Sequence, residues 1–320
     1  MSSTDCSLNK PYPVCCKPAF DFVADSFALV AEDCDKLVSD FGESLALSAD
    51  GRILVVGAPF LIVDNVQLYG AVFVYEQQKS LGASIKTPRY KLLQRIDAEQ
   101  GNAGLMGYKV AISGDGTRIA ASAINRTLVG VDDPPCSGVV FIYDQKCKNG
   151  KTQYALVQRL YAQKFDGQDI VYDRPGAFAG GFGFQLALSY NGRVLISGIS
   201  TTNAPQGKVY IYEDSTCTQL TTGCCVKPEP KPLFVFRQNM DKLTIVTDSG
   251  VSSTGQGLPD SVALDGDGAT VVLGCSETAL ASGQIIIYKR LAGTNTWQFD
   301  QVITPPGASS GDHFGVSVDI

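Results

Sequence analysis

The chain has 320 residues, 44% of them hydrophobic and 18% charged, with 33 glycines, a composition typical of many short strands joined by tight turns. Its formal net charge of −6 and the lack of a basic stripe argue against nucleic acid as a partner. No segment reaches the roughly 18 consecutive apolar residues of a membrane-spanning helix, so we expect no membrane span in this chain.

Residues 1–40 are expected to be an N-terminal segment outside the repeats, and four of the ten cysteines fall in it (Cys6, Cys15, Cys16 and Cys34). The segment has no apolar run of the kind found in a secretory signal. No two cysteines of the chain have the C-x₂-C spacing of a zinc site. We expect an extracellular or cell-surface location with disulfides, and the alternative is a protein with reduced structural thiols.

The main signal is an internal repeat. A strand-like segment with a small residue at its centre occurs four times, at Ala46, Ala111, Ala187 and Ala263. An Asp-Gly or Asn-Gly pair follows each time, a dipeptide that favours a tight hairpin. A third segment ends each time in tyrosine, at Tyr75, Tyr143, Tyr212 and Tyr288. Weaker fourth strands are expected at Tyr90–Ile96, Tyr154–Leu160, Leu233–Arg237 and Trp297–Ile303.

Units of four strands that cannot cover both faces alone have to stack on one another, and stacking around an axis gives a propeller. The sequence therefore predicts an all-β fold, a β-propeller of four-stranded antiparallel blades. Its repeats are expected at 41–98, 106–163, 182–238 and 258–304, with a partial or composite blade at 314–320. The alternative is a β-sandwich, which gives no reason for the recurring alanine.

The first unit carries the string FGESLALSADGRILVVGAP, followed by GAVFVY, and resembles the FG-GAP repeat of integrin α-subunit heads. The resemblance spans roughly residues 41–320 and implies a propeller, often of seven blades, that binds proteins or ligands at a cell surface. Ser122 and Pro259 replace repeat glycines, so the turn at Pro259 should differ. Four units do not close a seven-bladed ring. Either the chain is a fragment, or its N-terminal segment pairs with Phe314–Ile320 in a composite fifth blade.

Relatives of this kind often bind calcium between the first two strands of a unit. A calcium site needs six or more oxygen ligands, several of them carboxylates. Only the fourth unit offers two acids in that loop, Asp265 and Asp267, and no third acid follows nearby. We expect no metal and no cofactor, and the fourth loop is the place where calcium would bind if the chain took one.

Motifs for catalysis are lacking in the sequence. Its single histidine, His313, is expected to be a solvated loop residue, and there is no nucleophile elbow, P-loop or metal-spaced histidine pair. The inner strands offer alanine, leucine and valine where an enzymatic propeller would need carboxylates or arginines. We therefore expect a non-catalytic binding or adhesion module and not an enzyme. The alternative is a hydrolase or lyase whose site lies in blades absent from this chain.

Two loops carry candidate residues for binding a protein or another macromolecular ligand. The first contains Phe60, Ile62 and Tyr69, and is apolar where polar residues are normal. The second, residues 164–181, contains Phe165, Tyr172 and Arg174, which are residue types favoured at interfaces. For both loops the alternative is that the aromatic side chains cap their own blades. Asn125 begins a possible glycosylation sequon.

Overall fold

The computed structural model describes residues 40–61, 70–78, 89–98, 104–124, 138–148, 151–172, 181–199, 208–215, 234–240, 245–246, 252–253, 259–276, 283–307, 309 and 311–320. Within these residues the structure is all-β and contains no helix. The strands form four four-stranded antiparallel sheets and two small hairpins, which confirms the predicted fold class at this level.

Sheet one consists of β1 (Ser44–Leu47), β2 (Ile53–Ala58), β3 (Ala71–Gln78) and β4 (Arg89–Asp97). Sheet two consists of β5 (Met106–Ile112), β6 (Arg118–Ala123), β7 (Val139–Lys148) and β8 (Lys151–Leu160). Sheet three consists of β11 (Gln185–Leu188), β12 (Val194–Ile199), β13 (Lys208–Asp214) and β14 (Phe234–Met240). Sheet four consists of β17 (Ser261–Leu264), β18 (Thr270–Cys275), β19 (Gln284–Arg290) and β20 (Trp297–Ile303).

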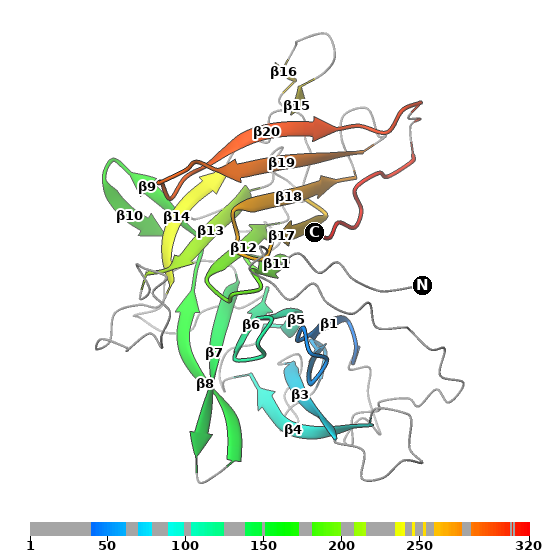
Figure 1. Cartoon of the computed structure of the whole chain (residues 1–320), viewed down its shortest axis with the longest axis vertical. Coiled ribbons are helices and arrows are strands. Elements are labelled where there is room, and N and C mark those ends of the chain that lie inside the picture. The colour runs from blue at the N-terminus through cyan, green and yellow to red at the C-terminus, as the bar shows by residue number, and fades with distance from the viewer. Residues whose placement is uncertain are drawn as a thin grey trace, which may run out of the picture.

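Every sheet has the same topology, in which each strand pairs with the next one along the chain. The first strand of each sheet is its inner strand and the last is its outer strand. The inner strands β1, β5, β11 and β17 lie beside one another in that order, and the sheets fan out from them (Figure 1). The four alanines occupy the same register position in these strands: Ala46 pairs with Val55, Ala111 with Ala120, Ala187 with Ile196 and Ala263 with Val272.

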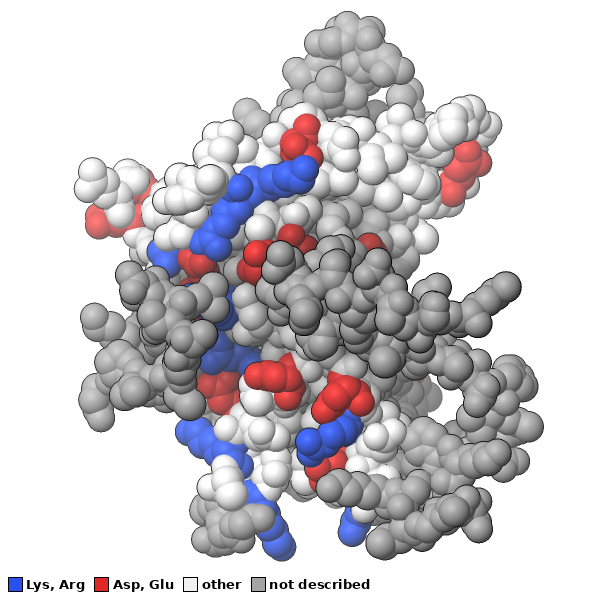
Figure 2. All heavy atoms as spheres, viewed as in Figure 1, with Lys and Arg blue, Asp and Glu red and all other residues white. Residues whose placement is uncertain are grey.

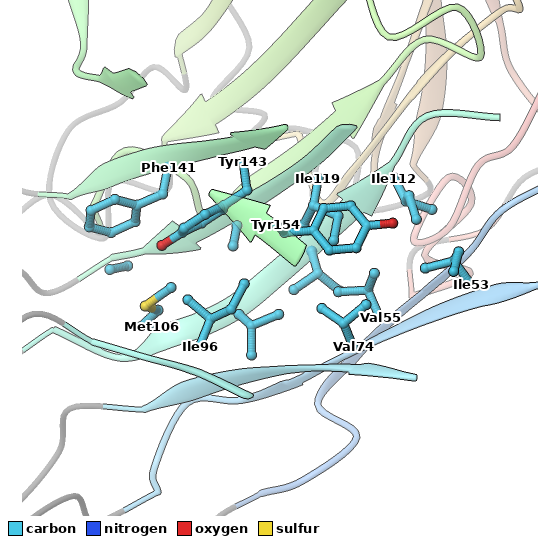
Figure 3. Close-up of a cluster of buried hydrophobic side chains, with 14 of the residues drawn as sticks. Ile53, Val55, Val74, Ile96, Met106, Ile112, Ile119, Phe141, Tyr143 and Tyr154 are labelled. Carbon is cyan, nitrogen blue, oxygen red and sulfur yellow. The ribbon is translucent and has the colours of Figure 1, made fainter. Parts of the chain in front are cut away.

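Three apolar cores join successive sheets. Figure 3 shows the core between sheets one and two, in which Val55 and Val74 of the first sheet face Ile119 and Tyr143 of the second. Strands that are apolar on both faces fit this arrangement, because sheets two and three each have a neighbouring sheet on both faces. Burial of each such aliphatic side chain contributes about 1.5–3 kcal/mol to folding.

The Asx-Gly hairpins of the first three units follow one hydrogen-bond pattern. In the first unit the hydroxyl of Ser48 donates to Asp50 Oδ1 at 2.7 Å, and the backbone N–H of Arg52 donates to the same oxygen at 2.9 Å. Although partial burial alone would raise it, these hydrogen bonds hold the pKa of Asp50 below its usual value. The N–H of Ala49 donates to the carbonyl of Gly114 at 3.0 Å, so the hairpins also link neighbouring sheets.

The glycines of the FG-GAP-like motif have a steric role at the junction between sheets. A Cβ atom on Gly57 would lie 1.9 Å from the carbonyl oxygen of Gly107. The backbones of successive units therefore touch where the motif places glycine in both. In the second unit Ser122 takes the place of Gly57, and its partner glycine, Gly183, has a φ of 97°.

Two further elements complete the described strands. The hairpin of β15 (Ile245–Val246) and β16 (Ser252–Ser253) lies beyond sheet three in the chain. The hairpin of β9 (Gln163–Asp166) and β10 (Asp169–Tyr172) falls where the sequence predicted a loop. Gly167, with a φ of 64°, lies in its turn, so Asp166-Gly167 carried the same hairpin signal as the repeat turns.

Candidate functional site

Three of the units begin after a turn with the same geometry. Asp40, Leu105 and His313 all have positive φ (46°, 20° and 50°) and precede the first residue of a unit. In the first two units, the N–H three positions later donates back to the carbonyl of this residue, from Glu43 at 3.0 Å and from Tyr108 at 3.2 Å. His313 thus has a backbone role in the turn of the fifth unit. Because the units share one topology, the residues after these turns lie at the same end of the sheets, here called the entry end.

Tyr108, Lys109 and Phe184 meet at the entry end, and Glu43 of the first unit lies near enough for its charge to act on Tyr108; these four residues are here called the entry cluster. The Tyr108 ring lies against the Phe184 ring, with centroids 5.4 Å apart and planes tilted by 33°. The Lys109 ammonium lies 5.3 Å from the centroid of the Tyr108 ring. Burial, and in second place the charge of Glu43, raises the pKa of Tyr108, so its phenol stays protonated at neutral pH.

The polar groups around the entry cluster have different uses. Ser44 accepts a hydrogen bond from the N–H of Val110 at 3.0 Å and so joins sheets one and two. Asp260, at the position equivalent to Glu43 in the fourth unit, accepts from the N–H of Ser276 at 2.6 Å. The side chains of Ser44 and Asp260 are therefore both engaged by backbone N–H groups. Among the described residues the exposed Glu43 carboxylate makes no hydrogen bond or ion pair.

The entry cluster corrects the expectation that the ends of the inner strands carry only alanine, leucine and valine. In the first unit the charged Glu43 follows directly after Phe41-Gly42, and in the second Tyr108 and Lys109 follow Met106-Gly107. The position occupied by Glu43, Tyr108 and Phe184 was therefore the signal in the sequence that could have located this site.

The residues predicted from the first loop are described only in part. Phe60 is half-buried, and the adjacent Leu61 is buried in the apolar cluster of sheet one. Ile62 and Tyr69 lie outside the described residues, as do Arg174 and the possible glycosylation site Asn125.

The two aromatic residues predicted from the second loop lie on one hairpin. Phe165 is 49% exposed and its ring centroid lies 5.0 Å from that of Phe236 in β14. Tyr172 is 45% exposed and its ring meets that of Tyr161, with centroids 6.0 Å apart. Each ring thus uses one side for packing and keeps the other in solvent. A role for these residues in partner binding stays a prediction.

No group of three or more metal-ligating side chains occurs among the described residues. In the fourth hairpin Asp265 accepts from the N–H of Thr270 at 2.9 Å, and Asp267 accepts from the N–H of Ala269 at 3.0 Å. These carboxylates therefore support the turn. In the part of the chain that is described, no helix has the length and apolar character to cross a membrane. Acidic and basic side chains are interspersed on the face in Figure 2.

Comparisons with known proteins bear on the fold. No family model matches the chain, so the likeness to FG-GAP repeats stays a resemblance, and no curated protein matches it either. The solved structures that it resembles include the periplasmic gluconolactonase PpgL of Pseudomonas aeruginosa, at 16% identity over 83% of this chain and 58% of that one, with a TM-score of 0.42. A candidate 6-phosphogluconolactonase from Bacteroides fragilis shows 12% identity over 86% of both chains and a TM-score of 0.34.

The propeller domain of the trilobed protease from Pyrococcus furiosus shows 9% identity over 80% of this chain and 55% of that one, with a TM-score of 0.34. The structural neighbours of the present chain are thus β-propellers. The prediction of a non-catalytic binding or adhesion module is wrong on this comparison, because proteins named as lactonases, which are enzymes, share the architecture. The likeness concerns the fold, and the activity of those proteins is their own.

Proposed function

We propose that this protein is a hydrolase that acts on small carboxylic esters at the entry cluster. The observation that supports this proposal is the position of Tyr108, which lies against Lys109 and Phe184 and close enough to Glu43 to be influenced by its charge. A protonated phenol and an ammonium group thus lie together beside an aromatic ring, and the charge of an exposed carboxylate reaches the phenol. The proposal takes up the hydrolase alternative, with its site on sheets that this chain contains.

In this proposal each group has one role. The Glu43 carboxylate removes a proton from water as the oxygen of that water bonds to the ester carbonyl carbon. The protonated Tyr108 hydroxyl and the Lys109 ammonium donate hydrogen bonds to the carbonyl oxygen as it gains negative charge. The acyl–oxygen bond then breaks, and the proton held by Glu43 passes to the departing alkoxide. Phe184 packs against the substrate and orients it.

The test is hydrolysis of 4-nitrophenyl acetate and of glucono-δ-lactone by the purified chain, as an open and a cyclic ester. We expect Glu43→Gln to lower kcat/KM by roughly 10²–10⁴-fold, the range for loss of a general base. Phe184→Ala should chiefly raise KM. The matched control is Glu76→Gln, which alters a half-buried glutamate of the same sheet that pairs with Arg52 at 3.2 Å and lies opposite Ile53, at the other end of β2 from Gly57 and Ser44. Equal activity of Glu43→Gln and the unaltered chain, or no turnover of either probe, would refute the proposal.

A further inference from the structure

A glutamine in the outer strand of each of the first three sheets bonds to the sheet that follows. Gln94 Nε2 donates to the carbonyl of Tyr154 at 3.0 Å, and its Oε1 accepts from the N–H of Tyr154 at 2.7 Å. Gln158 makes the same pair with Phe234, at 2.8 and 2.7 Å. Gln238 makes it with Trp297, at 2.9 and 2.8 Å. The arrangement, here called the glutamine clasp, thus joins each sheet to the next one.

Sheet four has the same glutamine without the clasp. Gln301 pairs in register with Ile287, just as Gln94 pairs with Val74 in sheet one. It also lies four positions after Trp297, as Gln94 lies four after Tyr90. Within the described residues Gln301 is exposed and makes no such pair of bonds.

The apolar residues around Gln301 differ from their equivalents in the same way. Near the end of the outer strand, Ile96, Leu160 and Met240 are 9%, 4% and 5% exposed and belong to the cores between sheets, whereas Ile303 is 40% exposed. In the third strand, the equivalents of Ile285 and Ile287 in the other sheets are completely buried: Val72, Val74, Val140, Ile142, Val209 and Ile211. Ile285 and Ile287 are only half-buried. Sheet four therefore has an open face.

The fifth unit begins against sheet four as the second begins against sheet one. Gly283 forms a parallel bridge with Phe314, the counterpart of the bridge between Gly70 and Met106. A Cβ on Gly274 would lie 1.9 Å from the carbonyl oxygen of Gly315, the same approach as that of Gly57 to Gly107. The hydroxyl of Ser261 donates to this carbonyl at 2.9 Å. The start of a following blade is thus already in place.

We propose that the open face of sheet four, made of Gln301, Ile303, Ile285 and Ile287, binds a fifth blade, the one that Phe314–Ile320 begins. The partner is a four-stranded antiparallel sheet of the same repeat. Its outer strand offers Gln301 the N–H and C=O of one residue, and the face that it turns toward sheet four covers the exposed Ile303 and the half-buried Ile285 and Ile287. Association of this kind buries apolar surface and satisfies the amide of Gln301 in one step.

The experiment supplies such a blade from the chain itself. Residues 113–162, the rest of the second unit, are appended after Ile320, so that the copy of Tyr154 can face Gln301. We expect the extended protein to have a higher Tm than the unaltered chain. Gln301→Ala should lower the Tm of the extended protein by about 4 °C, as loss of a pair of buried hydrogen bonds would, and should leave the Tm of the 320-residue chain unchanged.

Gln238→Ala is the matched control. The hydrogen bonds between Gln238 and Trp297 form in the 320-residue chain and in the extended protein alike, so their loss should lower the Tm of both by a similar amount. Two results would overturn the inference. One is an equal effect of Gln301→Ala with and without the added residues, which would mean that the open face is already covered or is not used. The other is a dimer of the 320-residue chain in sedimentation that Gln301→Ala dissociates, which would assign the face to a second copy.

Discussion

Arg118 donates a hydrogen bond from Nη1 to the carbonyl of Gly192, at 2.9 Å, and so supplies to the third hairpin what an aromatic side chain supplies elsewhere. In the other units the hairpin glycine accepts from the outer strand of its own sheet, as Gly116 does from the hydroxyl of Tyr154 and Gly268 from Nε1 of Trp297. The third unit has Phe234 at this position, which has no donor. Arg118 lies over that ring, 5.2 Å from its centroid.

Loss of Arg118 should therefore weaken the junction between sheets two and three. Its guanidinium also pairs with Asp144 at 2.7 Å and with Asp214 at 2.8 Å, and all three side chains are largely buried. We expect Arg118→Met to reduce the free energy of unfolding by about 3–5 kcal/mol, since two carboxylates lose a partner in a buried place. Urea unfolding measures this.

Arg52→Met is the control for that prediction. Arg52 pairs with Glu76 at 3.2 Å on the surface, where the Arg52 side chain is 59% exposed. Its removal should change the free energy of unfolding by less than about 1 kcal/mol. Similar losses in both variants would show that the buried network has no special role.

Alkaline pH should destabilise the protein in part through Tyr154. Burial, and then the charge of Asp115, raises the pKa of Tyr154 to about 12, against about 10 in an unfolded chain. A raised pKa means that the folded state holds this proton more tightly, so its contribution is complete below pH 10 and disappears as the pH rises through 12. We expect Tyr154→Phe to lose stability less steeply than the unaltered chain between pH 10 and 12, by ~1–2 kcal/mol, in urea unfolding across that range. Parallel curves for the two proteins would contradict the assignment.

The close approach of backbones at Gly57 predicts a strong effect of a single methyl group. Gly57→Ala would place Cβ 1.9 Å from the carbonyl oxygen of Gly107, so sheet two would have to move away from sheet one. We expect a loss of about 3 kcal/mol or more in the free energy of unfolding.

Gly198→Ala is the matched control for Gly57→Ala, because Gly198 occupies the same place in the third unit. There the nearest atom to an added Cβ is Cβ of Gln185 at 3.2 Å. The cost should therefore be small beside that of Gly57→Ala. If both substitutions were tolerated equally, the motif glycines would not be explained by contact between units.

Some features of the protein are determined locally, and the sequence was sufficient for them. An Asp-Gly or Asn-Gly pair between two apolar segments specifies a hairpin through its own backbone preferences, so the turn at Asp50-Gly51 and its three counterparts were predictable. Tyr75 and its counterparts were likewise predicted in buried third strands, because repetition of one pattern makes each unit support the interpretation of the others. The same rule applied to Asp166-Gly167 would have predicted the β9–β10 hairpin as well.

Other features depend on which unit packs against which, and only the tertiary structure decided them. Glu43, Tyr108 and Phe184 are more than 60 residues apart in the chain, and they come to one end of the sheets because three inner strands lie side by side. The bond from Arg118 to Gly192 likewise joins residues of different sheets. A pattern within one unit specifies where its own strands turn, whereas a site built from neighbouring units exists only after the apolar cores between the sheets have brought those units together.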